Sequence, residues 1–162
     1  MNWITKLAPK IKSILGGKKS LKVADNSWVK CSQCQTMLYS DDLEKNYYVC
    51  PNCDLHLYIH PRTRMKNLFD EGIYEEIPYP TVQLDPLNFK DTNSYKEKFK
   101  EAQAKTEMQD AFLIGYGKMK GISTTVVAMN FKFMGGSLSS AGAEAMVKAA
   151  EHAISYNTPF IM

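Results

Sequence analysis

The sequence lacks a hydrophobic run long enough to cross a membrane, and its first residues lack the apolar core of a secretory signal. A bilayer-spanning helix needs about 20 consecutive apolar residues, and no stretch of the chain approaches that length. Near the amino terminus, Lys6, Lys10 and Lys12 interrupt the apolar residues, so no continuous apolar segment of about 7–15 residues forms. We therefore expect no transmembrane segment and a reducing, cytoplasmic compartment.

The sequence also has little that points to a side-chain nucleophile. It contains three histidines and four cysteines, and we recognise no Ser/His/Asp or Cys/His constellation among them. Hydrophobic residues make up 44% of the chain and charged residues 23%, which is typical of a globular protein and excludes a disordered one. A chain of 162 residues is long enough for one ordinary domain, or for a small module followed by a modest domain.

Acidic residues are scarce at the amino terminus. Residues 1–30 carry seven lysines and one acid, Asp25, and so hold a charge of +6, whereas the whole chain carries +3. Apolar residues recur there at helical spacing until Gly16 and Gly17, which predicts a short amphipathic helix. Such a basic arm, over residues 1–27, could contact nucleic acid or an anionic membrane. We favour a solvated tail or a docking helix, because lysine-rich termini are common.

The rest of the chain alternates between helical and strand-like patterns, which predicts a mixed α/β fold. The predicted elements, in chain order, are a helix over 61–77 closed by DEG, an extended connection over 78–86, a helix over 93–108, a β-hairpin within 111–131 that turns around KMKG, a helix over 140–157 and a buried strand that begins at TPFIM.

All four cysteines lie in one short segment, as two C-x-x-C pairs. Cys31 and Cys34 form the first pair, Cys50 and Cys53 the second, and fifteen residues separate the pairs. This spacing is typical of a zinc ribbon. Each C-x-x-C turn presents two thiolates, and two turns complete a tetrahedron around Zn²⁺. Four thiolates leave no open position on the metal, so the site we predict is structural.

Two other uses of the cysteines fit the sequence less well. A dithiol redox motif needs only one C-x-x-C, next to a βαβ unit, and has no need of a second pair. Disulfides are disfavoured where no export signal is found. His56 and His60 follow the last cysteine, in a segment (55–60) that alternates like a strand. With four thiolates present, we expect both histidines to be ordinary exposed strand residues.

A second informative stretch, FKFMGGSLSS, precedes the alanine-rich helix. It reads as a strand, a Gly-Gly bend and a serine-capped helix start. Glycine lets another group approach the backbone closely, and free N–H groups at a helix start favour an oxyanion or a phosphate. Many glycines in such turns only shape the loop, however, so this stretch alone is a weak indication of a binding site.

The order of the motifs is far more specific than each motif alone. A four-cysteine ribbon is followed by LFDEG, then YKEKFKEAQAKT, then FKFMGGSLSS. This order, from about Trp28 to Met162, resembles the β subunit of bacterial-type acetyl-CoA carboxylase carboxyltransferase. The MGGSLSS segment is also similar to the corresponding loop of biotin-dependent acyl-CoA carboxyltransferases in general.

The resemblance implies a crotonase-like α/β spiral core over 61–162 with a zinc ribbon over 28–60. It implies transfer of a carboxyl group from carboxybiotin, held on a biotin carboxyl carrier protein, to acetyl-CoA, which gives malonyl-CoA. It also implies a structural Zn²⁺, an α subunit that completes the site in an α2β2 assembly, and biotin carboxylase as a further partner. Backbone N–H groups, and no side-chain nucleophile, would stabilise the enolate and the biotin anion.

One departure from the family pattern concerns catalysis. The family's second glycine-rich segment, of the type S-x-S-G-G-A-R, is absent from these 162 residues. We therefore expect a truncated chain that is inactive by itself, and we assign no catalytic residue. Gly135, Gly136 and Ser137 are the residues that we place near the acyl-CoA, although shaping the loop would explain the glycines equally well. The alternative function is a nucleic-acid-binding module that uses the ribbon and the basic arm.

Overall fold

The structure, a computed structural model, describes residues 27–78 and 82–162. The predicted amphipathic helix of the basic arm lies outside these residues. The chain divides into two compact units, one ending at Leu57 and one beginning at Tyr58, and each is described by itself. In the described part, none of the helices is both long and apolar enough to cross a bilayer.

The first unit has very little hydrophobic core. Strands β1 (Trp28–Lys30) and β2 (Met37–Tyr39) pair antiparallel, and helix α2 (Ser40–Lys45) follows directly. Leu38 and Leu43 are its fully buried aliphatic side chains, and they pack against buried cysteines. So few apolar groups cannot offset the entropy of ordering the segment. The fold of this unit therefore needs another source of stability.

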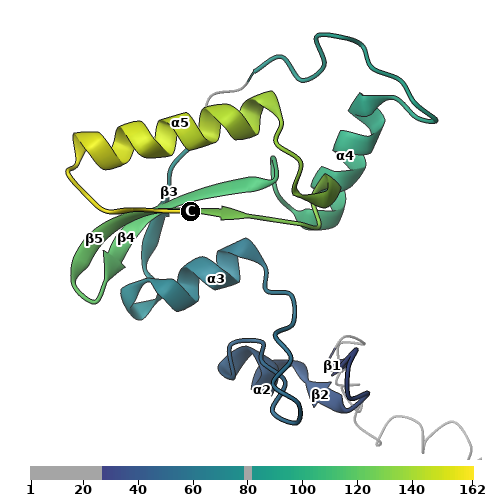
Figure 1. Ribbon diagram of the computed structural model, residues 1–162, viewed down its shortest axis with the longest axis vertical. Coiled ribbons are helices and arrows are strands. Elements are labelled where there is room, and N and C mark those ends of the chain that lie inside the picture. The colour runs from purple at the N-terminus through teal and green to yellow at the C-terminus, as the bar shows by residue number, and fades with distance from the viewer. Residues whose placement is uncertain (1–26, 79–81) are drawn as a thin grey trace, which may run out of the picture. The chain divides into compact units, whose positions relative to one another are not determined.

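A four-stranded sheet forms the centre of the second unit (Figure 1). The strand order is β3–β4–β5–β6, with antiparallel pairs except for β5 and β6, which run parallel because α5 connects them. The elements of this unit are α3 (Pro61–Leu68), η2 (Asp70–Gly72), β3 (Tyr74–Glu76), α4 (Tyr95–Thr106), β4 (Phe112–Met119), β5 (Ile122–Met129), η3 (Met134–Gly136), α5 (Ser140–Ser155) and β6 (Phe160–Ile161).

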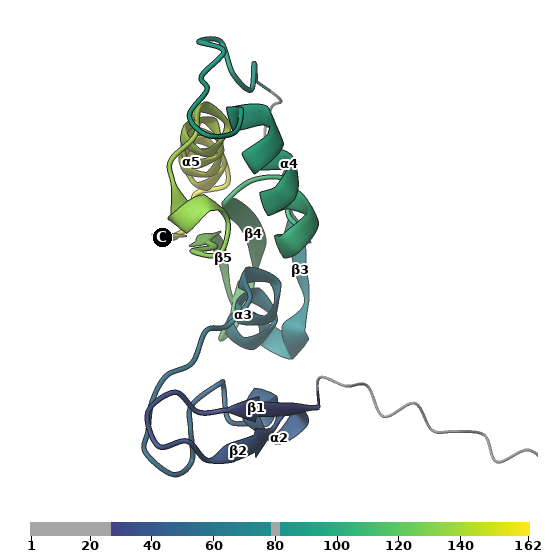
Figure 2. The same ribbon diagram turned by 90° about the vertical axis from the view of Figure 1, so that its right-hand side faces the viewer.

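Helices cover both faces of the sheet. Helix α5 lies on one face and α3 on the other (Figure 1), and both contact β4 and β5. The first four residues of β4 and the middle of β5 are therefore buried consecutively, rather than in alternation. Helix α4 packs beside the loop that contains η3 (Figure 2), where the Phe99 and Phe133 rings meet edge to face at 5.2 Å.

The β4–β5 hairpin turns at the predicted position. Met119 pairs with Ile122, which leaves Lys120 and Gly121 as a two-residue loop, both with positive φ. This backbone matches the twist of a hairpin and suits glycine at its second position. The Asp70 carboxylate accepts hydrogen bonds of 2.8 Å from both loop N–H groups. These bonds hold the pKa of Asp70 below its usual range.

We expect Asp70→Asn to destabilise the protein at pH 7 and to have a smaller effect at pH 3. A carboxyl whose pKa is lower in the folded state stabilises the fold above its unfolded pKa of about 3.9. That contribution disappears as the pH falls through the folded pKa. Thermal unfolding of both proteins at the two pH values measures this, with Glu71→Gln as the neighbouring control. A difference that persists undiminished at pH 3 would contradict the role of the Asp70 charge.

Besides the hairpin, four of the predicted elements are present. Helix α4 begins with the capping box that Ser94 and Glu97 form, and α5 begins after the Ser139 cap. Residues 82–86 contain neither helix nor strand, in agreement with the predicted connection. A strand does form within TPFIM, but Phe160 and Ile161 are about two-fifths exposed, because no described strand pairs with the outer edge of β6. The prediction that this strand is buried was wrong.

The helix predicted over 61–77 is wrong in its second half. Helix α3 ends at Leu68 because Phe69 has extended backbone, and Glu71 and Gly72, with positive φ, do not resume an α-helix. The chain then forms β3, which pairs with β4. The Tyr74 ring stacks on Phe69 at 5.5 Å, so a tertiary contact replaces the helical pattern that the sequence indicated.

The strand predicted over 55–60 also does not form. This segment contains only an isolated bridge between His56 and Val49. His56 is exposed, as predicted. His60 is not an ordinary exposed residue, because its ring caps the first turn of α3.

Candidate metal centre and glycine loop

The two C-x-x-C turns have the same backbone structure. In the first, the Cys31 N–H donates to the Thr36 carbonyl and the Cys31 carbonyl accepts from Gln35. In the second, Cys50 makes the equivalent bonds with the carbonyl of Leu55 and the N–H of Asp54. The residue after each second cysteine, Gln35 or Asp54, has positive φ. Both turns therefore direct their two thiols to the same side.

The four thiols form one cluster. Cys31 Sγ lies 3.7 Å from Cys53 Sγ, and Cys34 Sγ lies 3.7 Å from Cys50 Sγ. All four sulfurs lie within 4.8 Å of one another. A tetrahedron with Zn–S bonds of about 2.3 Å has edges of about 3.8 Å, so the sulfurs already have the spacing of zinc ligands. Disulfide bonds need a sulfur separation of about 2.05 Å, and the four cysteines are free.

Polar neighbours make the four thiols inequivalent. Hydrogen bonds from the Thr36 and Asn52 side chains lower the pKa of Cys34 to about 5. The backbone at Leu55 lowers the pKa of Cys53, but burial and the neighbouring thiols outweigh it and raise that pKa to about 12. A metal must displace the remaining protons, so its binding weakens as the pH falls. The site can hold a tetrahedral metal and offers no open position for a substrate.

Asn130 organises the loop that follows β5. Its side chain is fully buried, and its Oδ1 accepts from the Lys132 N–H at 2.9 Å and from the Tyr58 hydroxyl at 2.7 Å. Its own N–H donates to the Ala111 carbonyl at 2.7 Å. Phe133 then inserts a ring that is only 2% exposed. The glycine loop covers residues 130–139, between β5 and α5. Its start is therefore held in place by the hydrogen bonds of Asn130 and by the buried Phe133 ring.

The predicted substrate residues lie on the outer part of this loop. Gly135 and Gly136 have φ near +70°, and their predecessor Met134 also has positive φ, at +46°. A Cβ on Gly135 would meet no atom within 4 Å, whereas one on Gly136 would lie 3.1 Å from the Met129 sulfur. Ser137 follows in extended backbone. The loop is therefore open to an approaching group at Gly135, and the role of these three residues in substrate binding stays a prediction.

The start of α5 differs from the free anion site that the sequence indicated. The Ser139 hydroxyl caps the helix by accepting from the Gly142 N–H, and it donates to the Asp110 carboxylate at 2.8 Å. Asp110 is 2% exposed, so the protein itself supplies the negative charge that a helix start favours. A cavity of about 430 Å³ lies beside this cap. None of Gly135, Gly136 and Ser137 lines it.

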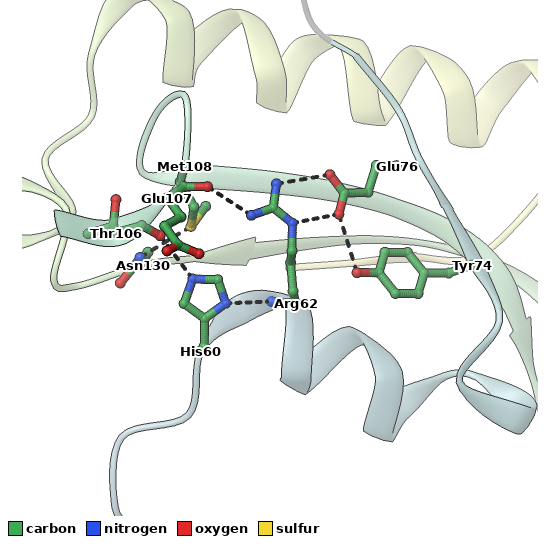
Figure 3. Close-up of polar contacts among 8 residues, drawn as sticks. All are labelled: His60, Arg62, Tyr74, Glu76, Thr106, Glu107, Met108 and Asn130. Carbon is green, nitrogen blue, oxygen red and sulfur yellow. Dashed lines mark hydrogen bonds and ion pairs between the residues drawn. The ribbon is translucent and has the colours of Figure 1, made fainter. Parts of the chain in front are cut away.

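A polar network that sequence reasoning missed joins three elements of the second unit (Figure 3). The Arg62 guanidinium donates to both carboxylate oxygens of Glu76, at 2.9 and 3.3 Å, and to the Glu107 carbonyl at 2.9 Å. His60 Nδ1 accepts from the Arg62 N–H, so Nε2 carries the proton and donates to the Thr106 carbonyl at 3.2 Å. The network therefore connects α3, β3 and the end of α4.

Two segments of the chain match known protein families. Residues 28–53 match the family described as acetyl-CoA carboxylase zinc finger domain. Residues 81–162, about half of the chain, match the family described as carboxyl transferase domain. The four-cysteine cluster thus lies in the segment that matches the zinc finger domain, and most of the α/β unit lies in the segment that matches the carboxyl transferase domain. The chain belongs to the carboxyl transferase domain family.

Curated relatives agree with both matches along the whole chain. The chain is 43% identical to the acetyl-coenzyme A carboxylase carboxyl transferase subunit beta of Rhizobium meliloti and 42% identical to that of Sinorhizobium medicae. The protein of the same name from Azorhizobium caulinodans is 43% identical. Each alignment covers 100% of this chain but 53% or 54% of the relative. The chain therefore spans about half the length of these relatives, and the resemblance seen in the motifs is confirmed.

Proposed function

We propose that the chain acts in the β subunit of an acetyl-CoA carboxylase carboxyltransferase. In this function a carboxyl group passes from carboxybiotin to acetyl-CoA and gives malonyl-CoA. The observation that carries the proposal is the carboxyl transferase match over residues 81–162, in a chain that carries a four-thiol ribbon before it. The identity of about 43% to β subunits supports it over the whole chain.

Backbone groups rather than side chains would perform the chemistry. When bound, carboxybiotin supplies the carboxyl group, and the protein's task is to stabilise the negative charge that develops on the thioester enolate and the biotin ureido group. The positive φ and the open surface at Gly135 support close approach of an acyl-CoA to this loop. We assign Gly135, Gly136 and Ser137 to substrate contact and no residue to proton transfer.

A crotonase-like spiral is the fold that we propose for the whole carboxyltransferase domain. The β4–β5 hairpin, the crossover helix α5 and the parallel strand β6 support it, because repeated units of this kind can build a spiral. The exposed apolar residues of β6 and of the last turn of α5 support contact with further structure in the assembled enzyme. We propose the α subunit, in an α2β2 assembly, as one part of that structure.

One structural Zn²⁺ per chain completes the proposal, and biotin belongs to a separate carrier protein that biotin carboxylase loads. A cytoplasmic location follows from the chemistry of the ribbon, since its four thiols must stay reduced in order to bind metal.

Reconstitution tests this function directly. The chain, as its gene encodes it, is mixed with its α subunit, and malonyl-CoA formation is measured from carboxybiotin and acetyl-CoA. We expect turnover from the pair and none from the 162 residues alone, which contain no S-x-S-G-G-A-R segment. A correctly folded pair without turnover would refute the proposal.

Nucleic-acid binding is a second function that one surface favours. The outer face of β1 and β2 carries Trp28 and Tyr39 as a cross-strand pair, with rings 5.4 Å apart, next to Lys30. Both aromatic side chains are exposed, and exposed rings beside cations suit stacked single-stranded bases. Filter binding of RNA at rising salt tests this function. Affinity that falls steeply with salt and depends on Trp28 supports it, and no binding at low salt refutes it.

A further inference from the structure

We propose that a cavity of about 350 Å³ in the second unit binds a phosphate group. The cavity lies between the segment that leads into α3, the end of α4 and the loop after β5. Its lining includes three cations, Arg62, Lys105 and Lys132, and one carboxylate, Glu107. Tyr58, His60 and Thr106 complete its lining.

The end of α4 would repel an anion if its carbonyl groups were free, because the carboxyl end of a helix carries partial negative charge. Here three of the carbonyls at this end have donors. His60 Nε2 donates to the Thr106 carbonyl, and Arg62 Nη1 donates to the Glu107 carbonyl (Figure 3). The Gln103 carbonyl accepts from the Glu107 N–H. These bonds reduce the repulsion that an anion would meet at this position.

Two ammonium groups beside this end of α4 have no acidic partner. Neither Lys105 nor Lys132 forms an ion pair with any residue of 27–78 or 82–162. Lys132 Nζ instead lies 3.9 Å from the centre of the Tyr58 ring, an attraction that positions the ammonium without neutralising its charge. Asn130 holds both ends of this contact, through the Tyr58 hydroxyl and the Lys132 N–H. The contacts of Asn130 and Tyr58 therefore determine the position of Lys132.

The charge balance of the cavity identifies the class of ligand. Arg62 already binds both carboxylate oxygens of Glu76, through Nε and Nη2, so Glu76 largely neutralises its charge. The two free ammonium groups then face one carboxylate, that of Glu107. Two lysines provide point charges that suit a phosphate dianion, which needs no planar, bidentate partner. Glu107 opposes such an ion, and its removal must strengthen binding.

The phosphate has two possible sources: an ester phosphate of an acyl-CoA, or a free phosphate or nucleotide. Three probes distinguish them, namely orthophosphate, ADP and acetyl-CoA. The test is a titration of the zinc-loaded chain, followed by the amide NMR signals of residues 58–62, 105–107 and 131–133. It measures binding without turnover, so its result is independent of the carboxyltransferase assay. Binding of acetyl-CoA alone assigns the site to the acyl-CoA substrate, and comparable binding of all three assigns it to free phosphate.

Matched variants decide whether these side chains form the site. We expect K105Q/K132Q to raise the dissociation constant of the phosphate probe about tenfold or more, because it removes both ammonium charges. K66Q/K148Q removes the same charge from the exposed sides of α3 and α5 and should leave binding unchanged. E107Q should tighten binding about threefold.

The proposal is overturned if no probe binds, or if K105Q/K132Q binds as tightly as the unmodified chain. If K105Q/K132Q does not fold, E107Q decides the question. Tighter binding by E107Q supports the site, and unchanged or weaker binding overturns it.

Discussion

Replacing Cys31 with serine should abolish metal binding and unfold the ribbon, while residues 58–162 keep their structure. Three thiolates cannot complete the tetrahedron, and a serine hydroxyl does not ionise to replace the fourth. The ribbon would lose most of the about 10–16 kcal/mol that a structural zinc supplies. Leu38 and Leu43, its buried aliphatic side chains, cannot compensate for this loss. Metal analysis and the amide NMR spectrum of the full chain measure both effects.

A neighbouring substitution provides the control for this prediction. Ser32 lies inside the same turn, is exposed, and contributes a carbonyl to the Gln35 side chain. Ser32→Ala should therefore retain the metal and the ribbon signals. If Cys31→Ser keeps one metal per chain together with dispersed ribbon signals, the assignment of Cys31 as a ligand is wrong.

Replacing Phe133 with alanine should destabilise the second unit by about 3–5 kcal/mol, the range for truncating a buried phenylalanine. The Phe133 ring is 2% exposed and packs edge to face against Phe99. Its loss leaves a cavity between α4 and the start of the glycine loop. The same change should loosen Gly135 and Gly136, because Phe133 anchors the loop that carries them. Urea unfolding measures the change in the free energy of unfolding.

Phe131 offers a matched comparison for Phe133, because it lies two residues earlier in the same loop but is 67% exposed. Phe131→Ala should change the free energy of unfolding by no more than about 0.5 kcal/mol. Equal effects of the two substitutions would contradict the anchoring role of Phe133.

The features predicted well from the sequence are those that local chemistry determines. The spacing of Cys31, Cys34, Cys50 and Cys53 predicted the thiol cluster, because each C-x-x-C turn forms within a few residues. The KMKG hairpin and the helices α4 and α5 also carry their own turn and cap signals. In each case the interacting groups are close in the sequence.

The features that were missed depend on residues far apart in the chain. The apolar pattern after Leu68 continued that of a helix, but pairing with β4 made a strand of Tyr74–Glu76. His60 has the sequence context of an exposed residue, and its contact with Thr106, 46 residues later, could not be read from that context. Arg62 likewise acquires its function from Glu76 and Glu107. Periodicity within one segment carries no information about such partners.

The glycine loop is an intermediate case. The sequence predicted the bend and the serine cap, and both are present. It did not predict that the Asp110 carboxylate lies at the start of α5, where the helix favours negative charge. Asp110 and its partner Ser139 are 29 positions apart in the sequence. A local motif therefore located the loop correctly, but a distant carboxylate determines what the start of the helix can bind.

Metal content together with thiol reactivity tests most directly whether a tetrathiolate cluster folds the ribbon. The purified chain is analysed for zinc and then treated with an alkylating reagent before and after chelation. We predict one zinc per chain, four thiols that resist alkylation, and rapid alkylation of all four after chelation, with loss of the ribbon's NMR signals. A chain that is free of metal, yet fully structured and with its four thiols alkylated at once, would contradict this account.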